Sequence, residues 1–514
     1  MFYLIDTIYM KQNNYLRNTI LLLLGGFLSF SSCSNDEPSN LSDKGNRITT
    51  DEQFFANHFA HDLLELCYYW NEEIASDLNK LNPNKNTDPI ATVDEIRFHK
   101  GDKKIDKWTQ LFNNIQQFQD NVSGITTTYG YLPITYQLEK GKKECISAVS
   151  FVYNDSPAAK AGLKRGDVIY KINGQTLTTD NYEELYNSSS ITLSMATVKI
   201  GGYEKVSITP TGKDIQLNAI HIYEDPILVD SVYEINGKKV GYLAYTSFDL
   251  TSIHELIRIA KDFKTQGIEE LILDLRYNGG GYVITENVMA SMFAPQDVVT
   301  AGKLYEKEKF NKQVTQDLAK KGENGETPFM TEFKFKNDNN QIVVISTKES
   351  NIGLKKVYGL ISKNTASASE ALLGGLMPYM DVEVIGKPSH GKYCTGWMIA
   401  AKDAYKKVPK PISKWGIYVM ASIYQNANGE TPCMPDGLQP SLSVDDNPIL
   451  PEQLGDVNEK LLKVALQRAG KVYNDRKTCS EMESLQLNDI EIPHKASFGK
   501  RIQLPGEWPF NPMN

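Results

Sequence analysis

The pattern of hydrophobic and polar positions divides the chain into regions of different structure. Between residues 50 and 119 large apolar side chains recur at spacings of three and four, which predicts helices with one buried face. From 120 to 212 short apolar runs alternate with glycine turns, as in β-rich domains. From 213 to 475 strand patterns alternate with helix patterns, which predicts βαβ units on a mostly parallel sheet. We therefore expect a multidomain α+β protein with an N-terminal helical region, a β-rich domain and an α/β core.

Individual elements of the core can be read from the same pattern. Residues 239–245 and 270–275 predict buried strands, and residues 252–265 predict an amphipathic helix that ends at Gly267. Residues 357–361 predict another strand, followed by a turn of small residues and a helix that begins near Ser369. The polar and then proline-rich residues 476–514 predict a loosely packed C-terminal tail.

Composition narrows the function classes. The chain has 514 residues, 41% of them hydrophobic, and a net charge of -8, which fits a globular protein and argues against a nucleic-acid partner. The six cysteines form no CxxC pair, and His254-Glu255 lacks the second histidine of a zinc motif because Arg258 stands in its place. We therefore predict no metal and no cofactor. Cysteines 394 and 433 could form one disulfide, or all the thiols could be free.

The N-terminal residues predict export. Lys11 and Arg17 precede the apolar residues 20–30, and small residues then lead to Cys33. This order is typical of a secretory signal and resembles a bacterial lipoprotein signal, residues 1–33, that ends at a lipidated Cys33. Residues 34–49 would be a polar tether, and the protein would be lipid-anchored in the cell envelope, at the outer membrane facing the periplasm or the surface. An ordinary signal peptide with an incidental cysteine, or a buried helix, is the alternative.

The β-rich region carries a recognisable motif. Residues 155–169 combine a short helix of small residues, a capping glycine at 162, a turn at Arg165-Gly166 and a strand, and Asn173-Gly174 then predicts a hairpin. This run resembles the PDZ signature of bacterial periplasmic proteases. The resemblance places Tyr129, Gly130, Tyr131 and Leu132 at the loop that binds a peptide's terminal carboxylate. Pro133 removes one N–H donor there, and a β-rich linker domain without a ligand is the alternative.

Three segments of the core carry candidate chemistry. The first is a strand that ends in the turn Asn278-Gly279-Gly280-Gly281, where unshielded N–H groups could hold an oxyanion. The second is the small-residue turn at Ser367, and the third is the loop that contains Lys392. Taken singly, the glycines could be a tight connection, Ser367 a helix cap and Lys392 a solvated lysine.

Taken together, the three segments resemble the C-terminal (tail-specific) processing proteases, whose core has a crotonase-like fold. The family pattern is carried here by Asp274-Leu275-Arg276-Tyr277-Asn278-Gly279-Gly280-Gly281, Thr365-Ala366-Ser367-Ala368-Ser369-Glu370 and Gly391-Lys392. The resemblance implies Ser367 as nucleophile and Lys392 as general base. It implies an oxyanion hole formed by Gly280, Gly281 and Ala368. Burial would give Lys392 the lowered pKa that a basic lysine needs.

One position departs from the family. Family members often carry a glutamine four residues after the lysine, which orients it, whereas this chain has Gly396. His390 is an alternative base, although its position favours it less than Lys392. An esterase of the α/β-hydrolase type lacks support because the chain has no Gly-x-Ser-x-Gly elbow at Ser367.

We therefore expect a serine endopeptidase that acts on protein or peptide substrates, with a PDZ-like domain that binds their C-terminal segments. The alternative is a weakly active or inactive surface lipoprotein that binds peptides through the same domain. The expected boundaries are 50–119 for the helical region, 120–212 for the PDZ-like domain and 213–475 for the protease core.

Overall fold

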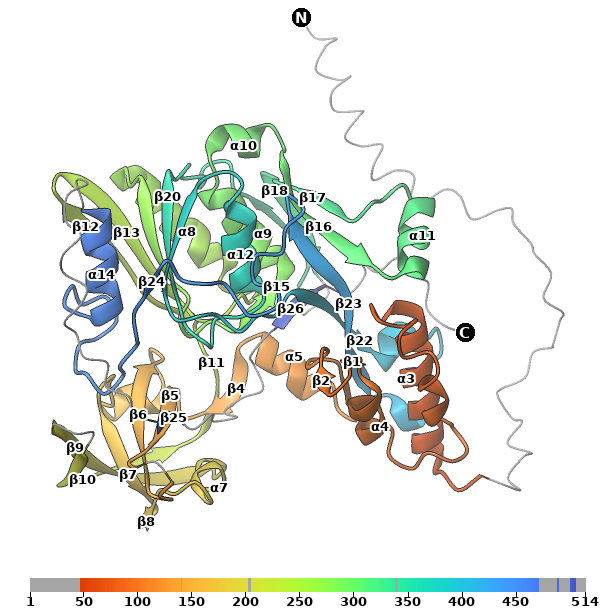
Figure 1. Ribbon diagram of the computed structural model, residues 1–514, viewed down its shortest axis with the longest axis horizontal. Coiled ribbons are helices and arrows are strands. Elements are labelled where there is room, and N and C mark those ends of the chain that lie inside the picture. The colour runs from red at the N-terminus through yellow and green to blue at the C-terminus, as the bar shows by residue number, and fades with distance from the viewer. Residues whose placement is uncertain are drawn as a thin grey trace, which may run out of the picture. The chain divides into compact units, whose positions relative to one another are not determined.

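The computed structural model describes residues 47–139, 141–201, 205–337, 341–470, 488–489 and 500–504. Figure 1 shows the arrangement of these elements. The predicted signal segment with Cys33, and most of the predicted tether, lie outside the described residues. Within the described part of the chain, no helix has both the length and the apolar character needed to cross a bilayer.

The N-terminal region is helical, as its apolar spacing predicts, but it is built onto the core. Helix α3 (Asp51–Cys67) begins at a capping box between Thr50 and Gln53, and α4 (Pro89–Ile96) and α5 (Gln116–Val122) follow. The short strand β3 (Gln110–Phe112) pairs antiparallel with β23 (Gly416–Asn426) of the core. The helical region therefore shares a sheet with the residues around the candidate site.

The PDZ-like region forms an antiparallel sheet. Its strand order is β10-β9-β7-β6-β5-β25, with β8 paired to β7. The strands are β5 (Tyr131–Gln137), β6 (Cys145–Val152), β7 (Val168–Ile172), β8 (Gln175–Thr176), β9 (Ser190–Gly201), β10 (Lys205–Asn218) and β25 (Asn488–Asp489). Helices α6 (Pro157–Lys160) and α7 (Tyr182–Tyr186) complete it. Strand β4 (Ile125–Thr128) pairs instead with β11 (Ile220–Tyr223).

The α/β core contains the predicted parallel sheet. Its order is β12-β13-β14-β20-β21-β24, and only the edge strand β12 is antiparallel to its neighbour. The strands are β12 (Ile227–Ile235), β13 (Lys238–Tyr245), β14 (Glu270–Asp274), β20 (Lys356–Ile361), β21 (Asp381–Gly386) and β24 (Leu442–Ser443). One face packs against α14 (Lys460–Ala469), and the other against α8 (Ile253–Gln266), α9 (Val283–Phe293) and α12 (Ala368–Leu376). Helix α8 ends at Gly267 in the left-handed conformation, as predicted.

A second sheet brings distant parts of the chain together. Its order is β15-β26-β22-β23-β16-β17. The strands not yet introduced are β15 (Gly280–Tyr282), β16 (Leu304–Phe310), β17 (Glu326–Pro328), β22 (Cys394–Ala400) and β26 (Lys500–Gln503). Strand β15 carries the glycine turn, and β22 follows the loop that contains Lys392.

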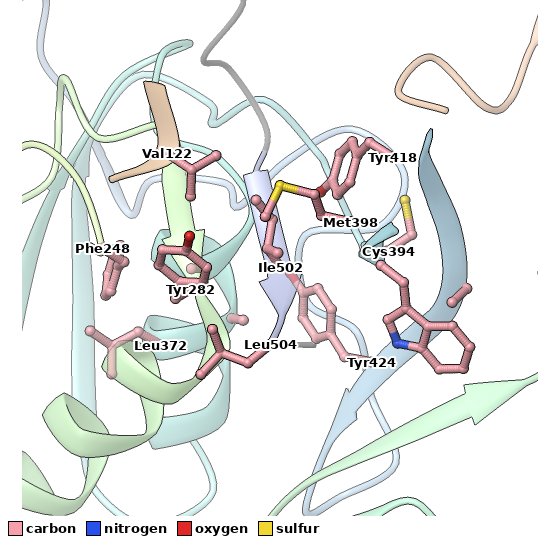
Figure 2. Close-up of a cluster of buried hydrophobic side chains, with 14 of the residues drawn as sticks. Val122, Phe248, Tyr282, Leu372, Cys394, Met398, Tyr418, Tyr424, Ile502 and Leu504 are labelled. Carbon is pink, nitrogen blue, oxygen red and sulfur yellow. The ribbon is translucent and has the colours of Figure 1, made fainter. Parts of the chain in front are cut away.

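The prediction of a loosely packed tail is wrong for residues 500–504. Strand β26 lies between β15 and β22 and is parallel to both. Ile502 is fully buried, and Figure 2 shows it between Tyr282 and Met398. The Arg501 side chain is also fully buried and forms ion pairs with Glu286, Glu306 and Glu308. The polar and then proline-rich composition predicted a loosely packed tail, but three glutamates from the core form ion pairs with Arg501 and hold the strand in the sheet.

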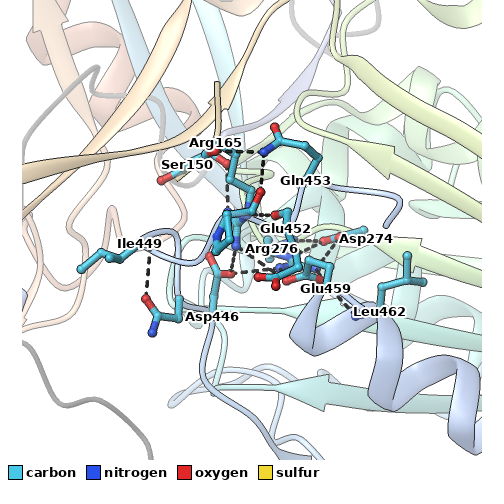
Figure 3. Close-up of polar contacts among 12 residues, drawn as sticks. Ser150, Arg165, Asp274, Arg276, Asp446, Ile449, Glu452, Gln453, Glu459 and Leu462 are labelled. Carbon is cyan, nitrogen blue, oxygen red and sulfur yellow. Dashed lines mark hydrogen bonds and ion pairs between the residues drawn. The ribbon is translucent and has the colours of Figure 1, made fainter. Parts of the chain in front are cut away.

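A buried polar network joins the PDZ-like sheet to the core (Figure 3). The Arg165 guanidinium donates to the Ser150 carbonyl at 2.9 Å, to the Tyr277 hydroxyl at 2.7 Å and to Asp446 at 2.6 Å. Arg276 also contacts Asp446, at 3.0 Å. Burial alone would raise the pKa of Asp446, but the two arginines hold it well below its usual range. The network therefore ties the PDZ-like domain to Tyr277, which leads into the glycine turn.

Candidate active site

Ser367 lies at the turn between β20 and α12, in a strained backbone conformation. Its φ is +62° and its ψ is −112°, a region that residues with a side chain rarely adopt. The side chain is fully buried. The backbone N–H of Ser367 donates to the Glu370 carboxylate at 2.7 Å. An ordinary helix cap has an extended backbone, so capping alone does not explain this geometry.

Lys392 reaches Ser367 from the loop between β21 and β22. Its Nζ lies 3.5 Å from Ser367 Oγ and 2.9 Å from the hydroxyl of Tyr418. The lysine is fully buried, and burial lowers its pKa to about 8. A substantial fraction of the side chain is therefore neutral near pH 8, as proton abstraction requires.

His390 lies on the outside of this arrangement. His390 is exposed, and its ring packs edge-on against the Trp108 ring, with the two ring centroids 6.3 Å apart. The structure therefore brings Lys392, rather than His390, to the Ser367 hydroxyl.

Glu370 organises both sides of the pair. One carboxylate oxygen accepts from the N–H groups of Ser367 and Lys392, and the other accepts from the Gly391 N–H and the Ser389 hydroxyl. Burial raises the pKa of Glu370 to about 7, although these four donors oppose the rise. Sequence reasoning missed this role. The signal was present, because a serine followed by a glutamate three residues later is the capping-box spacing.

Of the predicted oxyanion residues, Gly280 and Ala368 adjoin Ser367, and the N–H of Gly280 is already engaged. Gly280 has a φ of +98°, and a Cβ there would lie 2.1 Å from the Lys500 carbonyl oxygen, so only glycine fits. The Gly280 N–H donates to Asn278 Oδ1 at 2.9 Å and is not free in this conformation. Gly281 lies in β15, paired with β26. Ala368 is the first residue of α12, where N–H groups have no intrahelical acceptor.

A cavity of about 530 Å³ extends from the PDZ-like loop to the glycine turn. Its lining includes Tyr129, the first two residues of β5 (Tyr131 and Leu132), and Tyr277, Gly279 and Gly280 from the core. Gly130 packs so closely on Ser156 that a Cβ there would lie 2.0 Å from the serine Cβ. Gly280 also lies next to Ser367, since a Cβ built on Gly280 would lie 3.0 Å from Ser367 Cβ. Gly280 therefore adjoins both the cavity and the buried serine.

The cysteines near the site are free thiols. Cys394 and Cys433 are both buried and unbridged, so the disulfide considered between them is not formed. The Cys394 Sγ lies 3.3 Å from the Met420 sulfur, and Cys433 contacts the Tyr424 hydroxyl.

Comparisons with known proteins identify relatives of the core and of the PDZ-like region. Residues 239–444 match the model of peptidase family S41, and residues 149–187 match a PDZ domain model. The carboxy-terminal processing protease CtpA of Bacillus subtilis is 27% identical over 264 residues, which cover 51% of this chain and 47% of the relative. A CtpA-like serine protease of Staphylococcus epidermidis is 29% identical over 286 residues, which cover 54% of this chain and 47% of the relative. This chain thus spans about half the length of these relatives.

The fold also matches a solved structure. A crystal structure assigned to the S41 proteases, from Bacteroides fragilis NCTC 9343, superposes with a TM-score of 0.64 and 22% identity. The match covers 81% of this chain and 98% of that one. The family matches, read with the buried serine and lysine, lead to one conclusion: the chain carries a serine-type peptidase domain of family S41, similar to the C-terminal processing proteases, together with a PDZ domain.

Proposed function

We propose that this protein is an endopeptidase that cleaves protein substrates through Ser367 and Lys392. The observation that carries the proposal is the approach of Lys392 Nζ to Ser367 Oγ, 3.5 Å apart, in a site where burial lowers the lysine pKa to about 8. The neutral amine would take the hydroxyl proton as Ser367 Oγ attacks the scissile carbonyl. The ammonium would then return the proton to the leaving amine, and water would release the acyl group from the serine.

The oxyanion of the tetrahedral intermediate would be held by backbone N–H groups. The Ala368 N–H is suitably placed because it adjoins the nucleophile at the start of α12. The Gly280 N–H can contribute only after the turn releases it from Asn278 Oδ1. Since Ser367 is fully buried, residues around it must move before a substrate can reach its hydroxyl.

The direct test is cleavage of unfolded casein by the full-length protein in detergent. We expect cleavage by the wild type and by His390→Ala, and none by Ser367→Ala or Lys392→Ala. A fluorophosphonate probe should label the wild type and not Ser367→Ala. Retained cleavage in Lys392→Ala with loss in His390→Ala would overturn the assignment of the base. An inactive and unlabelled wild type would favour the alternative of a peptide-binding protein without catalysis.

We further propose that the PDZ domain binds the C-terminal segment of the substrate. Strand β5 begins at the loop of Tyr129, Gly130, Tyr131 and Leu132, and a peptide could extend its sheet there. Within the described residues, β25 pairs only with Tyr136 and Gln137 at the far end of β5. Fluorescence polarisation should show binding of peptides with a free C-terminal carboxylate and weaker binding of the same peptides when amidated. Equal affinities would remove the carboxylate from the proposal.

Lipid anchoring through Cys33 in the cell envelope remains a proposal that rests on the sequence alone. Palmitate labelling and globomycin-sensitive processing should be seen in the wild type and lost in Cys33→Ala. An unlabelled wild type would contradict it.

A further inference from the structure

The buried Lys392 ammonium has an unusual set of neighbours. Its two side-chain hydrogen-bond partners are Tyr418 and Ser367, and no carboxylate of the described residues lies within 4 Å of Nζ. The aromatic rings of Trp108 and Tyr418 also lie near it, with their centroids 5.7 Å and 5.2 Å from Nζ. The shorter of the two hydrogen bonds, at 2.9 Å, is the one to the Tyr418 hydroxyl. Tyr418 is therefore the main polar group that sets the direction of the amine.

The backbone of β26 fixes the orientation of that hydroxyl. It donates to the Arg501 carbonyl at 3.1 Å and accepts from the Arg501 N–H at 3.2 Å. A tyrosine hydroxyl has only one proton, so with that proton directed at Arg501 it presents a lone pair to Lys392. Burial raises the pKa of Tyr418 well above its usual range, which keeps the hydroxyl neutral.

This arrangement determines where the amine lone pair can point. A neutral amine that donates one hydrogen to Tyr418 keeps its lone pair for another direction, and Ser367 Oγ is the remaining polar neighbour. The geometry thus favours the transfer of a proton from serine to lysine and not the reverse donation.

Gly396 provides the space that Tyr418 occupies. The two residues lie on adjacent antiparallel strands, β22 and β23, next to a bulge between Thr395 and Gly396. A Cβ on Gly396 would lie 2.1 Å from the Tyr418 ring and 2.6 Å from the Met420 methyl group. A side chain at 396 and a tyrosine at 418 therefore exclude each other. Gly396, which departs from the family pattern, is therefore required for the Tyr418 ring to fit.

We propose that Tyr418 is the positioning residue of Lys392. Gly396 leaves room for the Tyr418 ring, and the backbone of Arg501 fixes the orientation of the Tyr418 hydroxyl. The inference rests on the proposed peptidase function, because it assigns the group that orients the general base.

The first test compares Tyr418→Phe with Tyr358→Phe. Tyr358 is also a buried tyrosine with one hydroxyl contact, to Glu270, but it lies on the opposite face of the parallel sheet. We expect Tyr418→Phe to lower kcat on casein about 10- to 100-fold at unchanged KM. Tyr358→Phe should leave both near the wild-type values. Wild-type kcat in Tyr418→Phe would overturn the inference.

A second test asks whether the position of the Tyr418 hydroxyl, and not only its presence, determines the activity. Gly396→Ala keeps the hydroxyl but displaces the ring that carries it, so it should lower kcat like Tyr418→Phe. The double variant should lose little more than either single variant, since both remove the same contact. Independent, multiplicative losses would contradict the inference.

A third measurement does not depend on catalysis. The pKa of Lys392 can be followed by NMR in protein labelled with ¹⁵N-lysine, with Lys392→Met to assign the resonance. Loss of the Tyr418 acceptor should disfavour the ammonium and lower this pKa by about one unit. An unchanged pKa in Tyr418→Phe would overturn the inference even if the wild type failed to cleave casein. Failure of cleavage with a lowered pKa would instead count against the proposed function alone.

Discussion

Glu370 holds Lys392 by its main chain and not by its charge, because the carboxylate accepts from the lysine N–H at 2.9 Å while Nζ points to Tyr418 and Ser367. The same oxygen accepts from the Ser367 N–H. One carboxylate thus fixes the backbones of both candidate catalytic residues and leaves the amine free of an ion pair. A direct ion pair would raise the lysine pKa and oppose its function as a base.

Glu370→Gln should impair the site although it is nearly isosteric. Each carboxylate oxygen of Glu370 accepts two hydrogen bonds, and an amide nitrogen in either place would face a backbone N–H. We expect a loss of stability of about 1–3 kcal/mol and a large loss of casein cleavage. Urea unfolding and initial rates check this, with the exposed Glu255→Gln as control. Wild-type activity in Glu370→Gln would contradict the role described for the carboxylate.

The pH dependence of the cleavage rate should reflect the ionisation of two buried groups, Lys392 and Glu370. The active form needs Lys392 neutral and Glu370 ionised, with pKa values of about 8 and about 7. Activity should therefore rise with pH to a plateau above about 8, and fall more steeply than one proton allows below pH 7. Initial rates of casein cleavage between pH 5.5 and 9.5 measure this. A rate that is flat from pH 6 to 9 would count against a lysine base.

Lys392→Met should yield an inactive but more stable protein. The lowered pKa of Lys392, from 10.5 to about 8, corresponds to about 3 kcal/mol of cost for burying the ammonium. Because the folded state binds this proton less tightly than the unfolded state, the cost is present in full below pH 8 and disappears as pH rises to about 10.5. Methionine fills a similar volume without charge. Thermal unfolding at pH 7 and pH 10 should show a gain in Tm only at the lower pH.

Arg501→Met should destabilise the whole core. The substitution leaves the buried carboxylates of Glu286 and Glu306 and the half-buried carboxylate of Glu308 without their shared cation. We expect the free energy of unfolding to fall by about 3–5 kcal/mol. Urea titration measures the change, and Lys463→Met on the exposed face of α14 should stay within about 0.5 kcal/mol of the wild type. A similarly small change in Arg501→Met would show that β26 contributes little to the core.

Asp446→Asn should loosen the contact between the PDZ domain and the core. It removes the carboxylate shared by Arg165 and Arg276, which we expect to cost about 3 kcal/mol. Since the arginines hold the Asp446 pKa low, the difference from wild type should shrink as pH falls below about 4. Hydrogen exchange in residues 149–169 should become faster. Asp445→Asn should leave it unchanged, because the half-buried Asp445 pairs with Lys387 and not with the two arginines. Unaltered exchange in Asp446→Asn would contradict the role of the network.

The periodic elements of the fold could be predicted from the sequence, because their pattern is local. Helix α8 and strands β13 and β14 follow directly from apolar spacing and from Gly267. Ser367 and Lys392 were found by their resemblance to a family, since on local evidence Ser367 is only a helix cap. The strained φ of Ser367 supplies what the local pattern lacked.

Tyr418 could not be predicted in the same way. It lies 26 residues from Lys392, and its approach depends on the register of β22 and β23 and on a bulge beside Gly396. The absence of a family glutamine at 396 indicated a missing group but not its replacement. The tail was misjudged for a similar reason, since the polar Lys500 and Arg501 are buried only because distant glutamates and backbone groups meet them.

The position of β26 has a consequence for how the protein is made. A chain is synthesised from its N-terminus, so residues 500–503 leave the ribosome after the other described strands of the core. Until they dock, the glycine turn lacks its neighbour in the sheet and the Tyr418 hydroxyl lacks both backbone partners. Among the described strands, the one that completes the candidate active site is therefore the last to be made, and the nascent chain is not exposed to the finished site during its synthesis.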